Sequence, residues 1–251
     1  MTLSLTACIL TYNEAANIAA CIESVRWCDA ILVFDSFSTD ATVQIAKEAG
    51  ANVIQRPFEN YSRQREAALQ AVESEWLLFV DADERSSPEQ AAEVRGLLAE
   101  TPCAGYWIPR HNFIFGKLTR HAGWYPDYQL RLLRQANAHY DMSRGVHETV
   151  ILEGEAGYLK TPLVHYNYRD RRQFIAKQEK YTDLAAHELF GQGVRPKPQN
   201  YLLQPLRHFR YRFVQLQGYR EGLHGLELSL WMSWYELQKY IRLGKLWQKV
   251  P

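Results

Sequence analysis

The first hundred residues alternate between short apolar segments and stretches with helical periodicity, and this alternation constrains the fold more than any other feature. The apolar segments have the length of buried strands and lie at 5–10, 31–34, 52–54 and 76–80. Helical patterns follow them from Asn13, from 43, over 62–72 and from Ser87. Strands that alternate with helices are typical of βαβ units. We therefore predict an α/β fold with a mostly parallel sheet flanked by helices.

Two helix starts carry capping signals. Asn13 precedes apolar residues at helical spacing, so we expect its side chain to cap the first helix. Ser87 is followed by Pro88 and then by Gln90, three residues after the cap, which is the pattern of a capped helix with proline at its first position.

Three polar clusters come directly after predicted strands, at 11–14, 35–40 and 81–83. Ligands of an open α/β sheet bind outside the carboxyl ends of its strands. We therefore expect the three clusters to meet in one crevice.

Asp81 and Asp83 are separated by one residue, so in an extended segment both carboxylates point to the same side. Two hard oxygen anions at a strand end suit Mg²⁺ or Mn²⁺, shared with a substrate diphosphate. The alternative is an acidic loop before a helix, whose N-terminus favours carboxylates.

Asp35 ends the second predicted strand, and the residues after it can cap the next helix. Because a carboxylate is costly to desolvate, its position points to a hydrogen bond with a base or a sugar. The first strand is followed by neither a Gly-x-Gly-x-x-Gly motif nor a Walker loop, which argues against NAD enzymes and P-loop ATPases. A nucleotide would therefore be held by side chains and a metal.

The helix–strand alternation fades beyond Tyr106, where we expect a strand at 105–110, loop-rich chain over 111–150 and a long helix over 170–190. A break containing glycine and proline precedes a helical tail over 200–246. We expect a catalytic domain over 1–190, with a nucleotide half at 1–105 and an acceptor half at 106–190, followed by a helical C-terminal extension over 191–251.

A net charge of +1 and an apolar fraction of 47% describe a globular chain without a bulk attraction to nucleic acid. Four cysteines without CxxC spacing favour a reducing compartment. The chain starts without the features of a signal peptide, and it contains no apolar run of about 18 residues. We therefore expect a cytoplasmic protein.

Three motifs, at 8–14, 33–42 and 79–84, resemble in order and spacing the nucleotide-sugar half of the family-2 glycosyltransferases, which have a Rossmann-like GT-A fold. The resemblance implies a UDP-sugar donor, with Asp83 on a divalent cation under the diphosphate and Asp81 facing the ribose or the donor sugar. The residues expected to bind the nucleotide sugar are Thr11, Tyr12, Asn13, Glu14, Asp35, Ser38, Arg63, Asp81 and Asp83. For Arg63 a solvated helix start is the alternative.

Motifs at 121–134, 145–148 and 163–166 are similar to the branch of this family that adds a β-linked glucose to the inner core of bacterial lipopolysaccharide. This resemblance implies a lipid-linked saccharide as the acceptor and glucose as the sugar. It places Trp124, Gln129, Arg131 and His147 at the acceptor or the diphosphate. The chain departs from many relatives at Phe37 and at Arg65-Glu66, which carry none of the core chemistry but could alter the fit of the donor.

Enzymes of this family invert the anomeric centre in one displacement, which needs a general base near the acceptor hydroxyl. Asp127 and Glu148 are the two candidates. We favour Asp127 because the segment that follows it resembles the one that carries the base in related lipid-phosphate glycosyltransferases. The alternatives are a turn residue at Asp127 and an ion pair of Glu148 with Arg131 or Arg144.

Two further side chains have both a functional and a structural interpretation. The guanidinium of Arg131 suits a diphosphate or an acceptor phosphate, and a structural salt bridge is the alternative. His165 could add a metal ligand, as a late histidine sometimes does in this family, and a hydrogen-bonded core residue is the alternative.

The last fifty residues interleave basic residues with aromatic rings, and Leu226, Leu230, Trp234, Leu237 and Ile241 recur at helical spacing. Such helices suit the surface of an anionic membrane, so we expect peripheral contact with the inner face of the cytoplasmic membrane. The alternative is packing on the catalytic domain or on a second subunit.

Three other functions compete with this interpretation. The same enzyme class could act on polyprenyl phosphate or on a protein, and a non-catalytic module could keep the nucleotide-sugar crevice. The carboxylates of Asp83, Asp127 and Glu148 argue against the module. A nucleotidylyltransferase would need a glycine-rich loop after the first strand, where this chain has Thr11-Tyr12-Asn13.

Overall fold

The computed structural model describes residues 4–142 and 149–249. The chain divides into two compact units, one from Met1–Arg110 and Asp127–His165, the other from His111–Pro126 and Tyr166–Pro251. The boundary that we expected near residue 190 falls at the end of a helix within the second unit.

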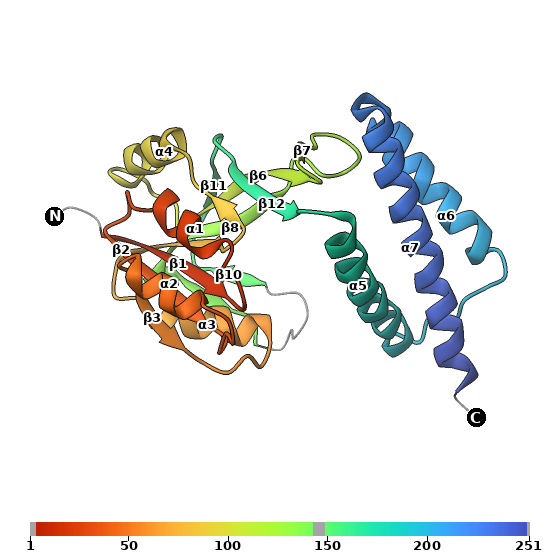
Figure 1. The fold of residues 1–251 in the computed structure, drawn as a ribbon, viewed down its shortest axis with the longest axis horizontal. Coiled ribbons are helices and arrows are strands. Elements are labelled where there is room, and N and C mark those ends of the chain that lie inside the picture. The colour runs from red at the N-terminus through yellow and green to blue at the C-terminus, as the bar shows by residue number, and fades with distance from the viewer. Residues whose placement is uncertain (1–3, 143–148, 250–251) are drawn as a thin grey trace. The chain divides into compact units, whose positions relative to one another are not determined.

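The first unit is built on a sheet whose parallel part has the strand order β3-β2-β1-β4 (Figure 1). These strands are β1 (Leu5–Thr11), β2 (Ala30–Asp35), β3 (Asn52–Gln55) and β4 (Trp76–Asp81). The helices that connect them are α1 (Ile18–Ser24), α2 (Thr42–Glu48) and α3 (Tyr61–Gln70), and α4 (Pro88–Leu98) follows β4. The predicted α/β fold with a parallel sheet flanked by helices is confirmed.

Helices cover both faces of the parallel sheet. On one face α1, α2 and α4 bury Ile22, Ala46 and Val94 against side chains such as Ile9 and Val80. On the other face α3 packs Ala68 and Leu69 against residues such as Cys8 and Phe79. Both faces of the central strands are therefore apolar, which explains their continuous apolar runs in the sequence.

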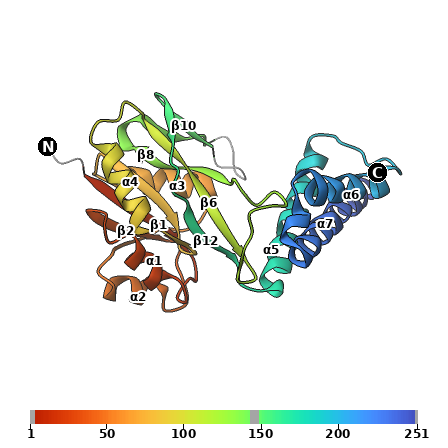
Figure 2. The same cartoon turned by 90° about the horizontal axis from the view of Figure 1, so that it is seen from above.

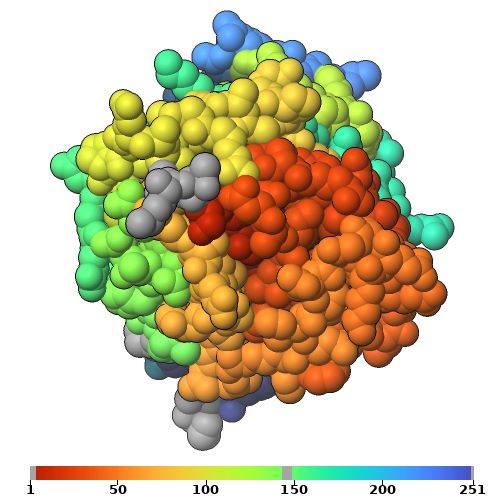
Figure 3. All heavy atoms as spheres, turned by 90° about the vertical axis from the view of Figure 1, so that its left-hand side faces the viewer, coloured from red at the N-terminus to blue at the C-terminus, as the bar shows by residue number. Residues whose placement is uncertain are grey.

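Hydrogen bonds hold α4 beside the chain around α1, and Figure 3 shows the yellow residues of α4 next to the red ones near α1. The backbone N–H of Ser86 donates to Ser24 Oγ over 3.2 Å, and Trp27 Nε1 donates to Ser86 Oγ over 3.1 Å. Arg95 of α4 forms an ion pair with Asp29 at the amino end of β2.

One predicted helix start is confirmed and the other is wrong. Ser87 is the N-cap of α4, and its hydroxyl accepts from the backbone N–H of Gln90 over 3.2 Å. The first helix begins at Ile18 with Asn17 at the N-cap position, not at Asn13. Asn13 has a left-handed backbone, with φ of 56°, and its side chain bonds to another loop instead.

Further strands of the first unit extend the sheet beyond β4. β8 (Tyr128–Arg134) pairs antiparallel with β4, and β6 (Gly105–Ile114) pairs antiparallel with β8. The same sheet contains β5 (Glu84–Arg85), β11 (Ala156–Tyr158) and β12 (Leu163–Tyr168), whereas β9 (Ala138–Tyr140) and β10 (Val150–Leu152) form a separate two-stranded sheet. β5 pairs with β12, so His165 lies opposite Glu84.

The second unit is mainly helical (Figure 2). After the short strand β7 (Lys117–Leu118) it contains α5 (Arg171–Gly191), α6 (Asn200–Arg210) and α7 (Leu223–Gln248). A π-helical turn (Tyr211–Gln215) and a 3₁₀ turn (Gly218–Glu221) connect α6 to α7, so the expected helical tail is two helices with a break between them. Both α5 and α6 pack on α7. Among the helices described here, none is long and apolar enough to cross a membrane.

Candidate active site

The carboxyl ends of β1 and β2 bring Thr11 and Asp35 together, because the two residues are register partners in the sheet. Thr11 Oγ1 donates to Asp35 Oδ1 over 3.0 Å. Asp35 is fully buried and also accepts from the Ser38 hydroxyl, the Ser38 backbone N–H and Gln55 Nε2. Its two oxygens thus accept hydrogen bonds from three residues, which a buried polar group requires.

The loops after β1 and β2 are tied to each other by side-chain hydrogen bonds. The backbone N–H of Asn13 donates to Ser38 Oγ and that of Glu14 donates to Thr42 Oγ1, both over 2.8 Å. The backbone N–H of Thr39 in turn donates to Asn13 Oδ1 over 2.8 Å. This reciprocal pairing explains the left-handed backbone of Asn13, a conformation that asparagine tolerates better than most residues.

Two aromatic rings of these loops remain in solvent. Tyr12 is 58% exposed and Phe37 is 51% exposed. Glu14, the last predicted residue of the cluster at 11–14, accepts from Asn17 Nδ2 over 2.6 Å. The structure therefore brings Thr11, Asn13 and Ser38 into the hydrogen-bond network of Asp35, while Tyr12 and Phe37 present their rings to the solvent.

At the end of β4, two buried arginines hold Asp81. Arg65 Nη2 donates to Asp81 Oδ1 over 3.0 Å, and Arg131 donates through Nη1 and Nη2 to both carboxylate oxygens. Burial alone would raise the pKa of Asp81, but Arg131, Arg65 and Arg110 outweigh it and hold that pKa well below its usual range. Asp81 is therefore an anion that positions two arginines.

A second ion-pair network is centred on Glu84, three residues after Asp81. Glu84 is fully buried, and its carboxylate accepts from the backbone N–H of Asp81 over 2.9 Å and from Arg110 Nη1 over 3.1 Å. Arg110 also donates through Nε and Nη2 to Asp127 Oδ2, over 3.0 and 2.7 Å. Gln129 Nε2 donates to the other oxygen of Asp127 over 2.9 Å. Arg110 thus links the loop after β4 to the predicted base.

Asp83 and His165 meet because β5 pairs with β12. His165 Nε2 lies 3.6 Å from Asp83 Oδ1, and both side chains are largely buried. A cluster of three or more His, Cys, Asp or Glu side chains suited to a metal is not found within 4–142 and 149–249. The chain thus brings together the two residues that we expected as metal ligands.

A small cavity of about 210 Å³ opens beside Asp81. Both arginines that bind Asp81 line it, together with Gln129, Trp107, Tyr140 and others. Arg131 is 6% exposed, and its Nε has no hydrogen-bond acceptor among the residues that the structure describes. The cavity therefore offers a cationic wall next to the aromatic ring of Trp107.

The other predicted residues lie elsewhere. Arg63 pairs with Glu59 over 2.6 Å on the exposed start of α3. Trp124 belongs to the second unit, where its ring contacts the Arg212 guanidinium at 5.4 Å. His147 and Glu148 lie outside the described residues.

Sequence reasoning missed Arg110 and Glu84, and it assigned no core chemistry to Arg65. No local pattern could have found Arg110, because its partners Glu84 and Asp127 lie 26 and 17 residues away. One feature of the sequence could have identified Glu84 as a site residue, namely its position directly after Asp83 at the end of a predicted strand.

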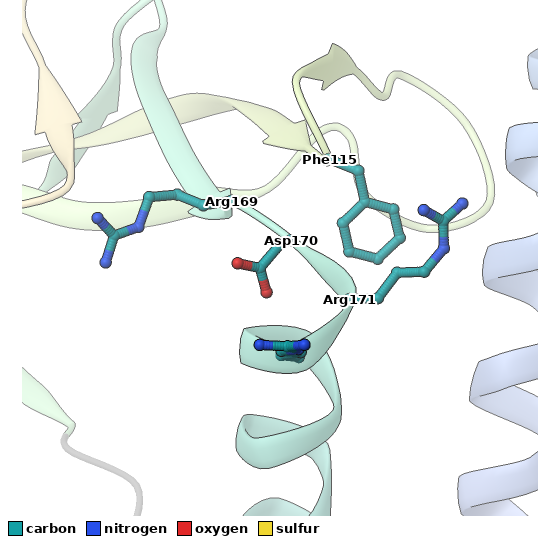
Figure 4. A pocket seen from close by; sticks show the side chains of 5 residues that line it. Phe115, Arg169, Asp170 and Arg171 are labelled. Carbon is teal, nitrogen blue, oxygen red and sulfur yellow. The ribbon is translucent and has the colours of Figure 1, made fainter.

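A larger cavity of about 470 Å³ lies in the second unit, at the start of α5 (Figure 4). Phe115 and the segment 169–172 line it. Figure 4 shows Arg169 and Arg171 pointing in opposite directions, and Arg171 pairs with Glu227. Asp170 caps α5 by accepting from the backbone N–H of Gln173 over 2.8 Å. Because its arginines diverge, this cavity is not the candidate active site.

Known proteins resemble the chain over nearly its full length. The lipopolysaccharide core biosynthesis glycosyltransferase LpsC of Rhizobium meliloti is 29% identical, over 98% of this chain and 93% of the relative. The uncharacterized glycosyltransferase RP128 of Rickettsia prowazekii is 42% identical, over 95% of this chain and 85% of the relative. Among solved structures, S. aureus TarS in complex with UDP-GlcNAc matches 98% of this chain and 92% of its own with a TM-score of 0.49 and 13% identity.

The relatives indicate an enzyme of the glycosyltransferase class, and the parallel α/β core with acidic side chains at adjacent strand ends is consistent with that class. The family model of glycosyl transferase family 2 matches residues 6–163, more than half of the chain. The chain belongs to glycosyl transferase family 2.

Proposed function

We propose that this glycosyltransferase uses a divalent metal and a UDP-sugar, and transfers a hexose, glucose, to a saccharide on a membrane lipid such as the lipopolysaccharide inner core. The observation that carries the proposal is the meeting of Asp83 with His165 at the strand end next to Asp35 and Asp81. The acceptor is inferred from the likeness to LpsC, whose name places it in lipopolysaccharide core biosynthesis.

The donor would lie across the ends of β1, β2 and β4. The loops of Asn13 and Ser38 supply hydrogen-bonding groups for the uridine, and the exposed ring of Tyr12 supplies an aromatic surface. Asp35 orients both loops because it accepts from Thr11 and Ser38. If Asp35 also accepts a hydrogen bond from the uracil base, one of its carboxylate oxygens must accept from both the base and Thr11 or Ser38.

Asp83 and His165 fit a divalent cation. Their closest polar atoms are 3.6 Å apart, too far for a hydrogen bond. Two ligands that each lie about 2.1 Å from one ion can be up to about 4.2 Å apart, so both can bind the same cation. A carboxylate oxygen with an imidazole nitrogen suits Mn²⁺, and the donor diphosphate would complete its ligands. When bound, the cation neutralises the charge that develops on the leaving diphosphate.

Asp127 is the proposed general base. It would take the proton of the acceptor hydroxyl as the acceptor oxygen bonds to the anomeric carbon and the bond from that carbon to the diphosphate breaks. Arg110 and Gln129 hold its two oxygens, so the carboxylate has a defined orientation. Arg131 donates to Asp81, and both Arg131 and Gln129 line the cavity where the acceptor would enter.

An acceptor anchored in a lipid would place the reaction at the inner face of the cytoplasmic membrane. We propose that the protein reaches this location by peripheral contact with the membrane surface.

The test is hydrolysis of UDP-sugars by the full-length protein in the absence of acceptor, compared across donors. We expect UDP release from UDP-glucose with Mn²⁺ and its loss with a chelator. Asp127→Asn should bind UDP as the wild type does, but turn over an acceptor at least about a hundredfold more slowly. UDP release that is unchanged by the chelator would refute the metal dependence. No UDP release from any UDP-sugar would refute the proposed class of donor. If Glu148→Gln slows turnover and Asp127→Asn does not, the base is Glu148.

A further inference from the structure

Helix α6 turns its apolar side chains to the solvent. Leu202 is 65% exposed, Leu206 is 57% exposed and Leu203 is 41% exposed. Val214, in the π-helical turn that continues α6, is 52% exposed. No residue of α6 is buried, although helices of globular proteins normally bury their apolar stripe.

The partly buried side of the same segment combines aromatic rings with polar contacts, and the rings of Phe209 and Phe213 stack on each other there. His208 Nδ1 lies 3.1 Å from the carbonyl oxygen of Met232 in α7. Arg212 Nη1 donates to the carbonyl oxygen of Ala122 over 2.7 Å, and its guanidinium lies over the ring of Trp124. The exposed leucines take part in neither these polar contacts nor the ring stack, so they form an additional apolar face that is open to solvent.

The chain around this face is strongly cationic. Between residues 195 and 220 the sequence contains six basic residues and no acidic one. These residues are Arg195, Lys197, Arg207, Arg210, Arg212 and Arg220. Arg207 and Arg210 are exposed and belong to α6 itself.

We propose that the leucine face, defined by Leu202, Leu203, Leu206 and Val214, inserts into the surface of an anionic phospholipid bilayer. Outward leucines with arginines on the same helix are what an interfacial helix needs, since the leucines enter the acyl region and the arginines bind lipid phosphates. The inference rests on the proposed lipid-linked acceptor and names the surface that reaches it.

A second copy of the chain is a poorer occupant of the leucine face. A twofold dimer would place the same patch on both sides of the interface, so the exposed Arg207 and Arg210 of one copy would meet the same arginines of the other. Like charges that face each other in a contact disfavour association. An anionic bilayer offers the opposite charge.

The experiment is co-sedimentation of the full-length protein with vesicles of phosphatidylcholine alone and of equal parts phosphatidylcholine and phosphatidylglycerol. We expect binding to the anionic vesicles that weakens as salt is raised. The double change Leu202→Ser with Leu206→Ser should weaken this binding at least about tenfold, because both side chains lose their apolar burial in the bilayer. Arg207→Gln with Arg210→Gln should weaken it about thirtyfold.

Matched controls come from the same unit. Leu184→Ser removes a leucine of α5 that is 39% exposed, and Arg169→Gln with Arg172→Gln removes two exposed arginines outside the cationic segment. We expect both control proteins to sediment with vesicles as the wild type does. Equal loss in controls and leucine variants would refute the assignment of the face.

Two other results would overturn the inference: equal binding of wild type and leucine variants to anionic vesicles, and a vesicle-free dimer that the leucine variants dissociate. UDP-glucose hydrolysis without vesicles should be the same in all variants. If the wild type hydrolyses UDP-glucose but does not bind vesicles, the inference of a membrane-binding face is refuted and the proposed function stands. If the wild type binds vesicles through the leucine face but hydrolyses no UDP-sugar, the proposed function is refuted and the membrane-binding face stands.

Discussion

Phe37 combines an unfavourable backbone conformation with an apolar ring that is exposed to solvent. Its φ of 59° is a left-handed conformation that a bulky side chain rarely adopts, and its ring is half exposed, so burial of the ring cannot offset the strain. The residue lies between Asp35 and Ser38, whose hydrogen bonds impose the turn.

We therefore expect Phe37→Gly to raise the free energy of unfolding by about 1 kcal/mol, since glycine adopts this backbone without strain. Urea unfolding measures the change. Tyr12→Gly is the control, because Tyr12 is a similarly exposed ring without a left-handed backbone and should gain nothing. A loss of stability in Phe37→Gly would show that the ring packs in solution.

At the scale of elements, the two-residue strand β5 organises more of the site than its length suggests. Its Glu84 accepts from Asp81 and Arg110, and its pairing with β12 brings His165 to Asp83. A neutral side chain at position 84 would remove one of the two carboxylates that pair with the buried guanidinium of Arg110.

Glu84→Gln should therefore lower the free energy of unfolding by about 2 kcal/mol, because breaking a buried ion pair costs more than breaking an exposed one. The measurement is denaturant unfolding. Glu23→Gln is the control, since Glu23 pairs with Arg26 on the surface and its loss should leave stability unchanged. Equal effects of the two changes would mean that the Glu84 network adds nothing to stability.

The local sequence patterns predicted the helices and strands, but not which side chains far apart in the sequence interact. The apolar runs gave β1, β2 and β4 because both faces of the sheet are covered, and Ser87 with Gln90 marked the start of α4. The prediction that Asn13 caps the first helix was wrong because its side chain accepts from the backbone N–H of Thr39, 26 residues away. The pairing of Arg65 and Arg131 with Asp81 depends on α3 and β8 converging on β4, which no periodicity records.

At the scale of the whole molecule, the paired Asp81 makes stability depend on pH. Its pKa is lowered in the folded protein, so the unfolded chain binds more protons in acid. The stabilisation is therefore complete above the ordinary pKa of an aspartate, about 3.9, and declines as the pH falls below it.

The difference in unfolding free energy between wild type and Asp81→Asn should thus be constant near neutral pH and shrink below about pH 4. Urea unfolding of both proteins across this range provides the measurement. A difference that stays constant into acid would contradict the assigned pairing of Asp81 with Arg65 and Arg131.

The central claim is that acidic side chains from separate strand ends hold one cation-bound nucleoside diphosphate. The most direct measurement is the shift in melting temperature that UDP and Mn²⁺ cause together, since a ligand that binds only the folded state stabilises it. We predict a clear shift for the wild type, its loss in Asp83→Ala and in His165→Ala, and its retention in Asp29→Asn, whose ion pair with Arg95 lies at the opposite end of β2. A full shift in Asp83→Ala, or none in the wild type, would contradict the account.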